Sequence, residues 1–399
     1  MAFGFGRQWK EILEADNVIQ VTGFVALDSN DTALNLYRSL LRPLLFRLDA
    51  ETAHDLAIGV AALPCIDRVG SLIGGGIIDP LLRVSIGSLE FPNPVGLAAG
   101  WDKNARCLSS LATLGFGAIE VGSVSARPSH GNAKPRLFRL PEDQAIVVNY
   151  GLPNDGAERV AQRLQSRRPS VPLGINVVRT NDGVAPHLSA DEIYDDYFHS
   201  VQTLHSAASY LVLNLSCPNT DGDSDFFATP GSLTPLLDRL AALELRCPIF
   251  LKVAPNPDPR SIERWISEVE RSPFVEGFLF NLPTGKPSAL EIKSPPNAYE
   301  HLPGAVAGRP VATLLDTCLS EMYRRMPPNR FTLIGGGGIF TAEDAYSRIR
   351  HGASLVQLYT ALIYEGPGVV RRIQRGLVKL LQRDGLENVT QAIGLEWRC

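Results

Sequence analysis

Residues 331–360, FTLIGGGGIFTAEDAYSRIRHGASLVQLYT, contain the pattern that decides the fold. An apolar run at 331–337 ends in glycines, and a second apolar run follows at 354–360. Between them, residues 341–352 have helical periodicity and begin at Thr341, a residue type that favours helix N-caps. A strand, a helix and a second strand in this order predict a β–α–β unit with two parallel strands.

The same unit recurs along the chain. The strand candidates are eight apolar runs, each followed by a turn signal: 94–100, 117–123, 172–178, 209–215, 248–254, 275–281, 331–337 and 354–360. Further helical patterns cover 189–205, which opens with a Ser189/Glu192 capping box, and 367–382. Eight such units are the count of a closed (β/α)8 TIM barrel. The alternative is a doubly wound open sheet, which would show a G-x-G-x-x-G turn where this chain has GLAAGWDKN.

An N-terminal helical extension is expected at 1–75, before a barrel domain at 76–399. Within the extension, residues 34–63 contain two short amphipathic helix patterns, and we expect breaks near Pro43 and Asp49. Leucines crowd the first pattern, and arginines lie between them. Two interpretations remain open: a helical cap packed on the barrel, or a hairpin that lies in a membrane surface and opens to a lipid-soluble partner.

Composition narrows the classes of partner. The 399 residues carry a formal charge of −4, which gives no reason to expect nucleic acid as a partner. The six cysteines include no C-x-x-C pair and the seven histidines form no ligand cluster, so we expect reduced thiols and no metal site. The first residues lack the apolar segment of a secretory signal, and no apolar run reaches the ~18 residues of a spanning helix. We expect a cytoplasmic protein, either free or held peripherally at the cytoplasmic membrane.

Polar side chains stand at the ends of the predicted strands, where a barrel has its active-site mouth. They are Lys103, Ser123, Asn176, Asn214, Cys217, Asn219, Lys252, Asn281, Tyr359 and Thr360. The glycine run 335–338 follows the seventh strand and precedes a helix, where backbone N–H groups can approach an anion. The loops after the seventh and eighth strands are the usual phosphate site of this fold, so we predict a phosphate there, with Tyr359 and Thr360 as further donors. A flexible glycine turn is the alternative.

Two lysines and one cysteine are the candidates for chemistry. Lys103 and Lys252 each end an apolar strand, where a cation would stabilise negative charge on a flavin or a phosphate. The alternative role is a Schiff-base lysine, as in an aldolase. Cys217 follows the fourth strand; a thiol there serves either as a proton-accepting base or as a small buried apolar group.

Five strings of the sequence resemble the dihydroorotate dehydrogenase family: NPVGLAAGWDKN, GFGAIEVGSVSARPSHGNAKPRLFRLPEDQA, LNLSCPNT, LKVAP and HGASLVQLYTALIYEGP. The similarity runs from about residue 36 to 395, and LLRPLLFRLDAETAHDLA resembles the helical extension of the membrane-associated, quinone-dependent class (class 2).

The resemblance implies an FMN-dependent enzyme that oxidises a CH–CH bond. A base removes a proton from dihydroorotate, a hydride passes to FMN, and a quinone that enters through the N-terminal helices reoxidises the flavin. The catalytic residues would be Cys217 as the base and Lys103. The substrate contacts would be Lys103, Asn214, Asn219 and Asn281. The FMN contacts would be Ala98, Ala99, Gly100, Lys103, Ser123, Asn176, Asn214, Lys252, Gly308, Gly337, Gly338, Tyr359 and Thr360.

The sequence also departs from the family pattern at the substrate side. Cys217 stands where the quinone-dependent class has serine, and cysteine belongs to the soluble class (class 1). The family string YGFNN is YGLPN here, so Pro153 replaces an asparagine, and NLPT in place of TNTT puts Leu282 at a second one. Because unpaired polar substrate atoms lower affinity, we infer a retained flavin site and a substrate altered from dihydroorotate. Two alternatives stay open: an authentic dihydroorotate dehydrogenase (quinone) of pyrimidine biosynthesis, and an inactive flavin-binding scaffold.

Overall fold

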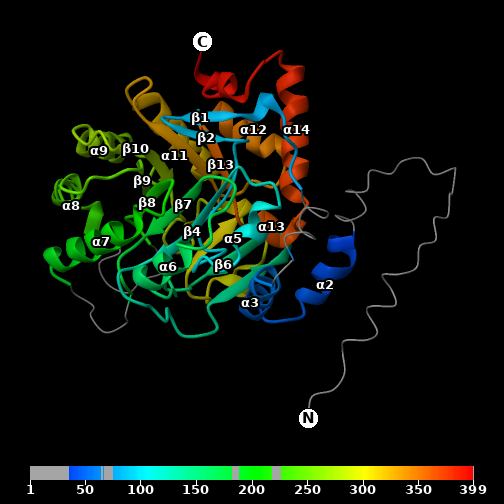
Figure 1. Ribbon diagram of the computed structural model, residues 1–399. Coiled ribbons are helices and arrows are strands. Elements are labelled where there is room, and N and C mark those ends of the chain that lie inside the picture. The colour runs from blue at the N-terminus through cyan, green and yellow to red at the C-terminus, as the bar shows by residue number, and fades with distance from the viewer. Residues whose placement is uncertain (1–35, 64–65, 67–74, 182–187, 218–225, 399) are drawn as a thin grey trace.

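Eight parallel strands close into a barrel in the computed structural model, which describes residues 36–63, 66, 75–181, 188–217 and 226–398 (Figure 1). The strands are β3 (Val95–Leu97), β4 (Ala118–Val124), β7 (Leu173–Val177), β8 (Tyr210–Asn214), β9 (Ile249–Val253), β10 (Val275–Phe280), β12 (Thr332–Gly336) and β13 (Leu355–Leu358). Neighbours in the sequence are neighbours in the barrel, and β13 pairs with β3 to close it. All eight predicted strands are therefore confirmed, and with them the TIM barrel.

The barrel strands are short and apolar because both of their faces are covered. Every residue of β3, β7, β8 and β13 is buried. Side chains from the strands fill the interior, and the outer face packs against helices, as parallel sheets require. In the view of Figure 1, α7, α8 and α9 lie on one side of the strands, and α12 and α14 lie on the other.

Two helices of the barrel wall, those at 190–204 and 342–350, begin at the caps that the sequence predicted. The helices of the wall are α5 (Leu108–Ala112), α6 (Ala157–Leu164), α7 (Ala190–Leu204), α8 (Thr234–Ala241), α9 (Pro259–Val269), α10 (Pro296–Tyr299), α11 (Ala312–Arg325), α12 (Ala342–Arg350), α13 (Thr360–Glu365) and α14 (Val369–Arg383). The Ser189/Glu192 capping box is present at α7, and Thr341 forms the same motif with Asp344 at α12. These bonds satisfy the first amides of each helix, which have no partner within the helix.

Two small antiparallel sheets accompany the barrel, and the sequence patterns did not predict them. The first is a hairpin of β1 (Val84–Ile86) and β2 (Leu89–Phe91). The second has the order β11–β6–β5, from β5 (Leu137–Leu140), β6 (Ala145–Val148) and β11 (Ala305–Gly308). The second sheet matters for function because residues of β6 and β11 line the main cavity.

The N-terminal helices differ from the expectation in one respect. A π-helical run, η1 (Tyr37–Leu41), continues directly into α2 (Arg42–Leu45), so Pro43 does not break the helix. A proline lacks the N–H that an α-helix interior needs, but Pro43 stands in the first turn of α2, where that N–H is dispensable. Asp49 does begin the next helix, α3 (Ala50–Ala61), and its carboxylate accepts the N–H groups of Glu51 and Thr52.

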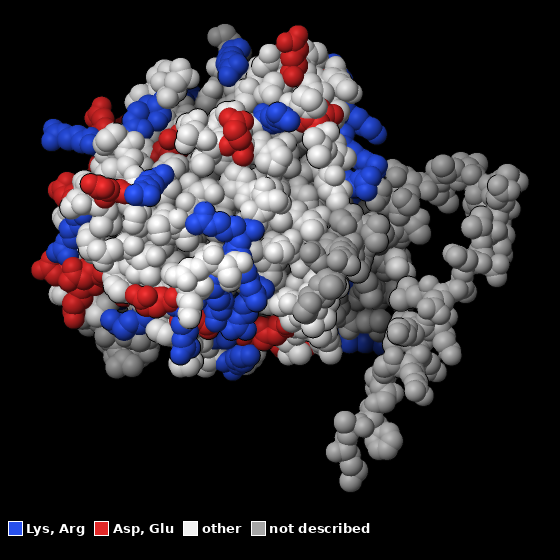
Figure 2. All heavy atoms as spheres, viewed as in Figure 1, with Lys and Arg blue, Asp and Glu red and all other residues white. Residues whose placement is uncertain are grey.

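The surface of the N-terminal helices is unusually apolar. Of the exposed large apolar side chains in the described chain, eight belong to this region: Leu36, Leu40, Leu41, Leu44, Leu48, Leu56, Val60 and Leu63. Elsewhere, charged side chains of both signs are interspersed on the face that Figure 2 shows. The longest described helices, α7 and α14, have 15 residues, and no described helix has the length and apolar character to cross a bilayer.

Hydrogen bonds join the N-terminal helices to α13. Tyr37 Oη donates to the carbonyl of Ile363 at 2.6 Å, and Arg42 Nη1 donates to the carbonyl of Tyr364 at 2.9 Å. The expected domain boundary at residue 75 follows residues 67–74, which lie outside the described chain, so that boundary stays a prediction.

Candidate active site

A cavity lies at the carboxyl ends of the barrel strands, where the sequence predicted the site. Fourteen of the predicted site residues line it: Ala98, Ala99, Gly100, Lys103, Ser123, Asn214, Cys217, Lys252, Asn281, Gly308, Gly337, Gly338, Tyr359 and Thr360. Asn219 lies outside the described residues. Apolar side chains, among them Leu152, Pro153 and Leu282, complete the wall. The strand ends thus bring residues from the whole length of the chain to one place, as the fold requires.

Glycines form a cradle at one end of the cavity. Gly337 and Gly338 have φ angles of +75° and +74°, which L-residues with side chains rarely adopt. A Cβ at Gly337 would lie 2.4 Å from Leu315 Cδ1, and one at Gly338 would lie 2.5 Å from Ala312 Cβ. Gly308, with φ +113°, completes the cradle from β11. The bare backbone there fits a phosphate group, which bonds to amide N–H groups.

A chain of buried amides and a carboxylate runs from the cavity into the barrel interior. Asn214 Nδ2 donates to Ser123 Oγ at 3.3 Å, and Ser123 Oγ donates to Asn176 Oδ1 at 2.5 Å. Asn176 Nδ2 and Gln357 Nε2 both donate to the Glu120 carboxylate, at 2.8 and 2.5 Å. Asn176 is therefore fully buried behind Ser123 and is not part of the cavity wall. The chain fixes the orientation of the polar groups that do face the cavity.

Cys217 stands three residues after the end of β8, half-buried on the cavity wall. The segment before it is held by Asn281, whose Nδ2 donates to Asn214 Oδ1 at 2.8 Å and to the carbonyl of Ser216 at 2.7 Å. Asn281 Oδ1 also accepts the N–H of Leu282 at 2.9 Å. The predicted substrate ligand Asn281 thus uses its carboxamide to position the turn that carries Cys217. Residue type and spacing gave no signal for this bracing role.

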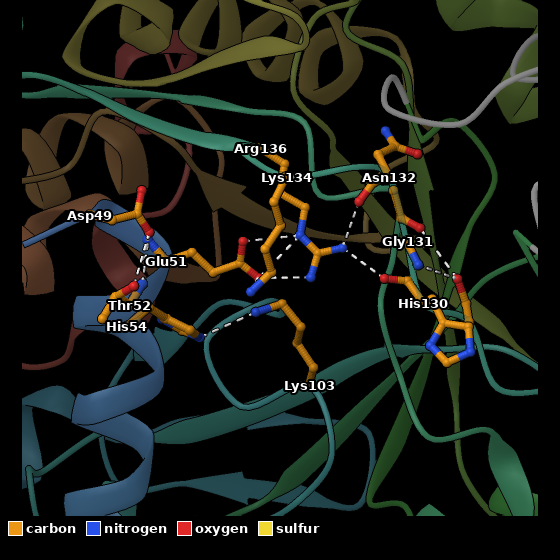
Figure 3. A network of polar contacts seen from close by, with 12 residues as sticks. Asp49, Glu51, Thr52, His54, Lys103, His130, Gly131, Asn132, Lys134 and Arg136 are labelled. Carbon is orange, nitrogen blue, oxygen red and sulfur yellow. Dashed lines mark hydrogen bonds and ion pairs between the residues drawn. The ribbon is translucent and has the colours of Figure 1, made fainter.

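Lys103 faces His54 and Tyr150 rather than an acidic side chain. Its Nζ lies 3.2 Å from His54 Nε2 (Figure 3). The same Nζ lies 4.1 Å from the centroid of the Tyr150 ring. Burial lowers the pKa of Lys103 to about 8. Burial, and then the charge of Lys103, lower the pKa of His54 well below its ordinary value. A lysine that is costly to keep charged is well suited to stabilise an anion that enters the site.

A second, smaller cavity lies under the N-terminal helices. Its walls are Tyr37, Leu45, Phe46, Ala50, Ala53, His54, Ala57, Trp101, Leu137, Arg139, Ile146, Tyr359 and Ile363. Ile146 and Tyr359 also line the first cavity, so the two spaces share a wall. The sequence predicted an entry route through these helices but none of the lining residues, because the wall is assembled from α3, β5, β6 and α13.

A buried ion pair ties α3 to the barrel. Arg136 contacts the carboxylate of Glu51 through Nη2 at 2.7 Å and Nε at 3.1 Å, and Lys134 Nζ lies 3.2 Å from the same carboxylate (Figure 3). Arg136 Nη1 also donates to the carbonyls of His130 and Asn132. Burial alone would raise the pKa of Glu51, but Arg136 and Lys134 hold it below its ordinary value. The second cavity is therefore bounded by a helix that is fixed to the barrel.

A barrel with a glycine cradle, a largely apolar cavity and two lysines at its strand ends is typical of a (β/α)8 enzyme that binds a phosphate-bearing ligand. The family profile for Dihydroorotate dehydrogenase matches residues 81–381. The chain is 38% identical over 367 residues to a protein of Natronomonas pharaonis named "Dihydroorotate dehydrogenase (quinone)", and the match covers 91% of this chain and all of the relative. A protein of the same name from Novosphingobium aromaticivorans is 39% identical over 365 residues, with 90% of this chain and 99% of the relative covered.

A solved structure supports the same relationship. The crystal structure of the dihydroorotate dehydrogenase of Eimeria tenella in complex with ferulenol has a TM-score of 0.77 and 31% identity, and covers 88% of this chain and 96% of that one. The chain belongs to the dihydroorotate dehydrogenase family. Members of this family are FMN-dependent oxidoreductases that act on CH–CH bonds, so the predictions of the family, the enzyme class and the cofactor are confirmed.

Proposed function

We propose that this protein is a dihydroorotate dehydrogenase of pyrimidine biosynthesis that delivers its electrons to a quinone. The relatives at 38–39% identity carry that name. The observation that carries the proposal is the pair of adjoining cavities, one at the barrel mouth and one under the N-terminal helices. Two reactants of different polarity can each have a separate site in this arrangement.

FMN fits the first cavity. Gly308, Gly337 and Gly338 would hold its phosphate with bare backbone, and Tyr359 and Thr360 would add further donors. The remaining FMN contacts would be Ala98, Ala99, Gly100, Lys103, Ser123, Asn214 and Lys252, with Asn176 acting through Ser123. The bound flavin supplies a two-electron acceptor for hydride.

The protein side chains supply the proton chemistry. Cys217 would remove a proton from the substrate carbon, and its position on the turn after β8 is fixed by Asn281. Lys103 would stabilise the negative charge that develops as the substrate is oxidised. Asn214 and Asn219 remain the proposed contacts for the polar atoms of the substrate, whereas Asn281 would act by holding the turn that carries Cys217.

The second cavity would bind the quinone. Its wall is mainly apolar, and Arg139 and His54 are two of its polar groups that could hold a carbonyl oxygen. The exposed leucines of η1, α2 and α3 would rest on the cytoplasmic membrane, where quinones dissolve. Co-sedimentation with anionic phospholipid vesicles tests this contact: a L40S/L44S variant should lose it, and binding that is unchanged in the variant would contradict it.

The decisive experiment is anaerobic. The purified protein should be yellow, and dihydroorotate should bleach the absorbance of its oxidised flavin within the dead time of manual mixing. A soluble ubiquinone analogue should then restore the absorbance. A colourless protein that does not take up FMN would overturn the proposal.

A second candidate function rests on Pro153 and Leu282, which line the cavity with apolar atoms where asparagines were expected. A less polar substrate with an acidic C–H beside a carbonyl would fit these two side chains better than dihydroorotate. A yellow protein that dihydroorotate does not bleach, but that a less polar cyclic amide or ketone does, would favour this candidate. A flavin that no such substrate reduces would favour the inactive flavin-binding scaffold. Borohydride trapping of a substrate on Lys252 would favour the alternative role of this lysine, a Schiff base as in an aldolase.

A further inference from the structure

We propose that Arg348 orients the phosphate-binding loop: its guanidinium group holds the carbonyls of Gly336 and Gly337 away from the cavity, so that the amides of Gly337 and Gly338 face into it. This inference rests on the proposed function, in which FMN binds in the first cavity. It assigns a role to a buried arginine that touches neither the cofactor nor the substrate.

The contacts of Arg348 all lie behind the loop. The side chain extends from α12 and is 2% exposed. Nη1 donates to the carbonyl of Gly336, and Nη2 donates to the carbonyl of Gly337 at 3.0 Å. Nε forms an ion pair with Asp316 of α11. Because the carboxylate neutralises the guanidinium, orientation of the loop is the main effect, and added positive charge is minor.

Because of peptide geometry, the hydrogen bonds of Arg348 also set the direction of the neighbouring backbone N–H groups. In a trans peptide the C=O of one residue and the N–H of the next point in opposite directions. When Arg348 binds the carbonyls of Gly336 and Gly337, the N–H groups of Gly337 and Gly338 must point away from it. Both glycines line the cavity, and within the described residues neither N–H has a hydrogen-bond acceptor. Unpaired amides that face a cavity are the donors that an anion requires.

The glycine run 335–338 leaves the space that the Arg348 side chain occupies. A Cβ at Gly335 would lie 2.4 Å from Arg348 Cγ, so the first glycine of the run makes room for the arginine stem. The third and fourth glycines, Gly337 and Gly338, make room for α11 instead. The glycines of this run therefore serve two purposes. Gly335 makes room for the Arg348 side chain, and Gly337 and Gly338 present their backbone to the ligand.

The test compares two flavins that differ only in the phosphate. Dissociation constants for FMN and for riboflavin are measured with the apoprotein by flavin fluorescence, for the wild type, R348M and R348K. Loss of two oriented amides should weaken FMN binding about tenfold or more in R348M and change riboflavin binding by less than about twofold. R348K, which keeps the charge and one donor group, should lie between the wild type and R348M.

Arg264 of α9 provides the matched control. It is also a helical arginine that donates to a loop carbonyl, that of Phe227, and pairs with a carboxylate, that of Glu268, but it is not part of the cavity wall. R264M should keep the FMN-to-riboflavin affinity ratio of the wild type.

Four outcomes would overturn the inference. An equal loss of both flavins in R348M, or a loss in R264M as selective as that in R348M, would show a structural role alone. Should R348M fail to fold, R348K with a wild-type affinity ratio would overturn it equally. A wild-type apoprotein that binds riboflavin and FMN with equal affinity would exclude a phosphate site here, and one that binds neither would refute the proposed function itself.

Discussion

Cys217 is the residue on which the proposed proton transfer depends. Replacement by alanine should lower the rate of flavin reduction by dihydroorotate about 10²- to 10⁴-fold, because no other proton acceptor has been assigned to that step. FMN content should stay at the wild-type level, since Cys217 is not among the proposed FMN ligands. Anaerobic stopped-flow absorbance measures the rate. Reduction as fast as in the wild type would show that another group is the base.

The stability of the apoprotein should depend on Lys103 above neutral pH. Burial lowers the pKa of Lys103 from 10.5 to about 8. At pH values between these two, Lys103 has lost its proton in the folded chain but keeps it in the unfolded chain. Rising pH therefore favours the folded state through this residue, and the effect is absent below about pH 8. Urea unfolding of wild type and K103M at pH 7, 8, 9 and 10 should show the wild type gaining stability relative to the variant. The exposed Lys379 supplies the control, K379M, and parallel pH curves for all three proteins would contradict the prediction.

At the residue scale, location on a strand end was predictable, but hydrogen-bond partners were not. The positions of Lys103, Cys217 and Lys252 on the cavity wall follow from their places after apolar strands. The bracing role of Asn281 depends on its approach to Asn214, 67 positions away, which no local pattern encodes. Arg348 had no signal either, because a charged residue on an amphipathic helix is usually a solvated one.

At the scale of elements, the barrel strands were predictable because each is an apolar run that ends at a turn and a helix. The sheet of β5, β6 and β11 was not, because its strands have four residues each and β11 follows β6 by more than 150 positions. Periodicity detects elements that are long and regular, whereas these strands exist through long-range pairing. Pro43 was misjudged for a different reason: it is the second residue of α2, and an α-helix needs no N–H from that position.

Two glycines in helices allow mutations whose expected effects on the free energy of unfolding are opposite in sign. A Cβ at Gly376 of α14 would lie 2.2 Å from Ala342 Cβ of α12, so G376A should lower the free energy of unfolding by about 1–3 kcal/mol. Gly59 of α3 has no atom within 4 Å of a built Cβ, so G59A should raise the free energy of unfolding by about 0.5–1 kcal/mol. Urea unfolding of both variants measures the difference. Equal stability of the two would show that α12 and α14 are not in close contact.

At the scale of the whole molecule, the Glu51–Arg136 pair should govern how firmly the N-terminal helices are held. Both side chains are buried, at 7% and 9% exposure. E51A leaves an unpaired buried guanidinium group and should cost about 3–5 kcal/mol. The double variant E51A/R136M should cost less than the sum of the single variants, because each single change already breaks the pair. Urea unfolding of the wild type, the single variants and the double variant measures these free energies. Strictly additive losses would show that the two residues act independently.

The hydrogen bond from Tyr37 to Ile363 spans 326 positions, and it has a consequence for biosynthesis. The leucine-rich segment of η1 and α2 is translated more than 300 positions before α13, on which it docks. Closure of the barrel also requires a late segment, because Val95 of β3 pairs with Val356 of β13. The leucines of this segment stay exposed even after docking, so we expect the nascent chain to present an apolar surface that a chaperone or lipid can engage before the barrel has closed.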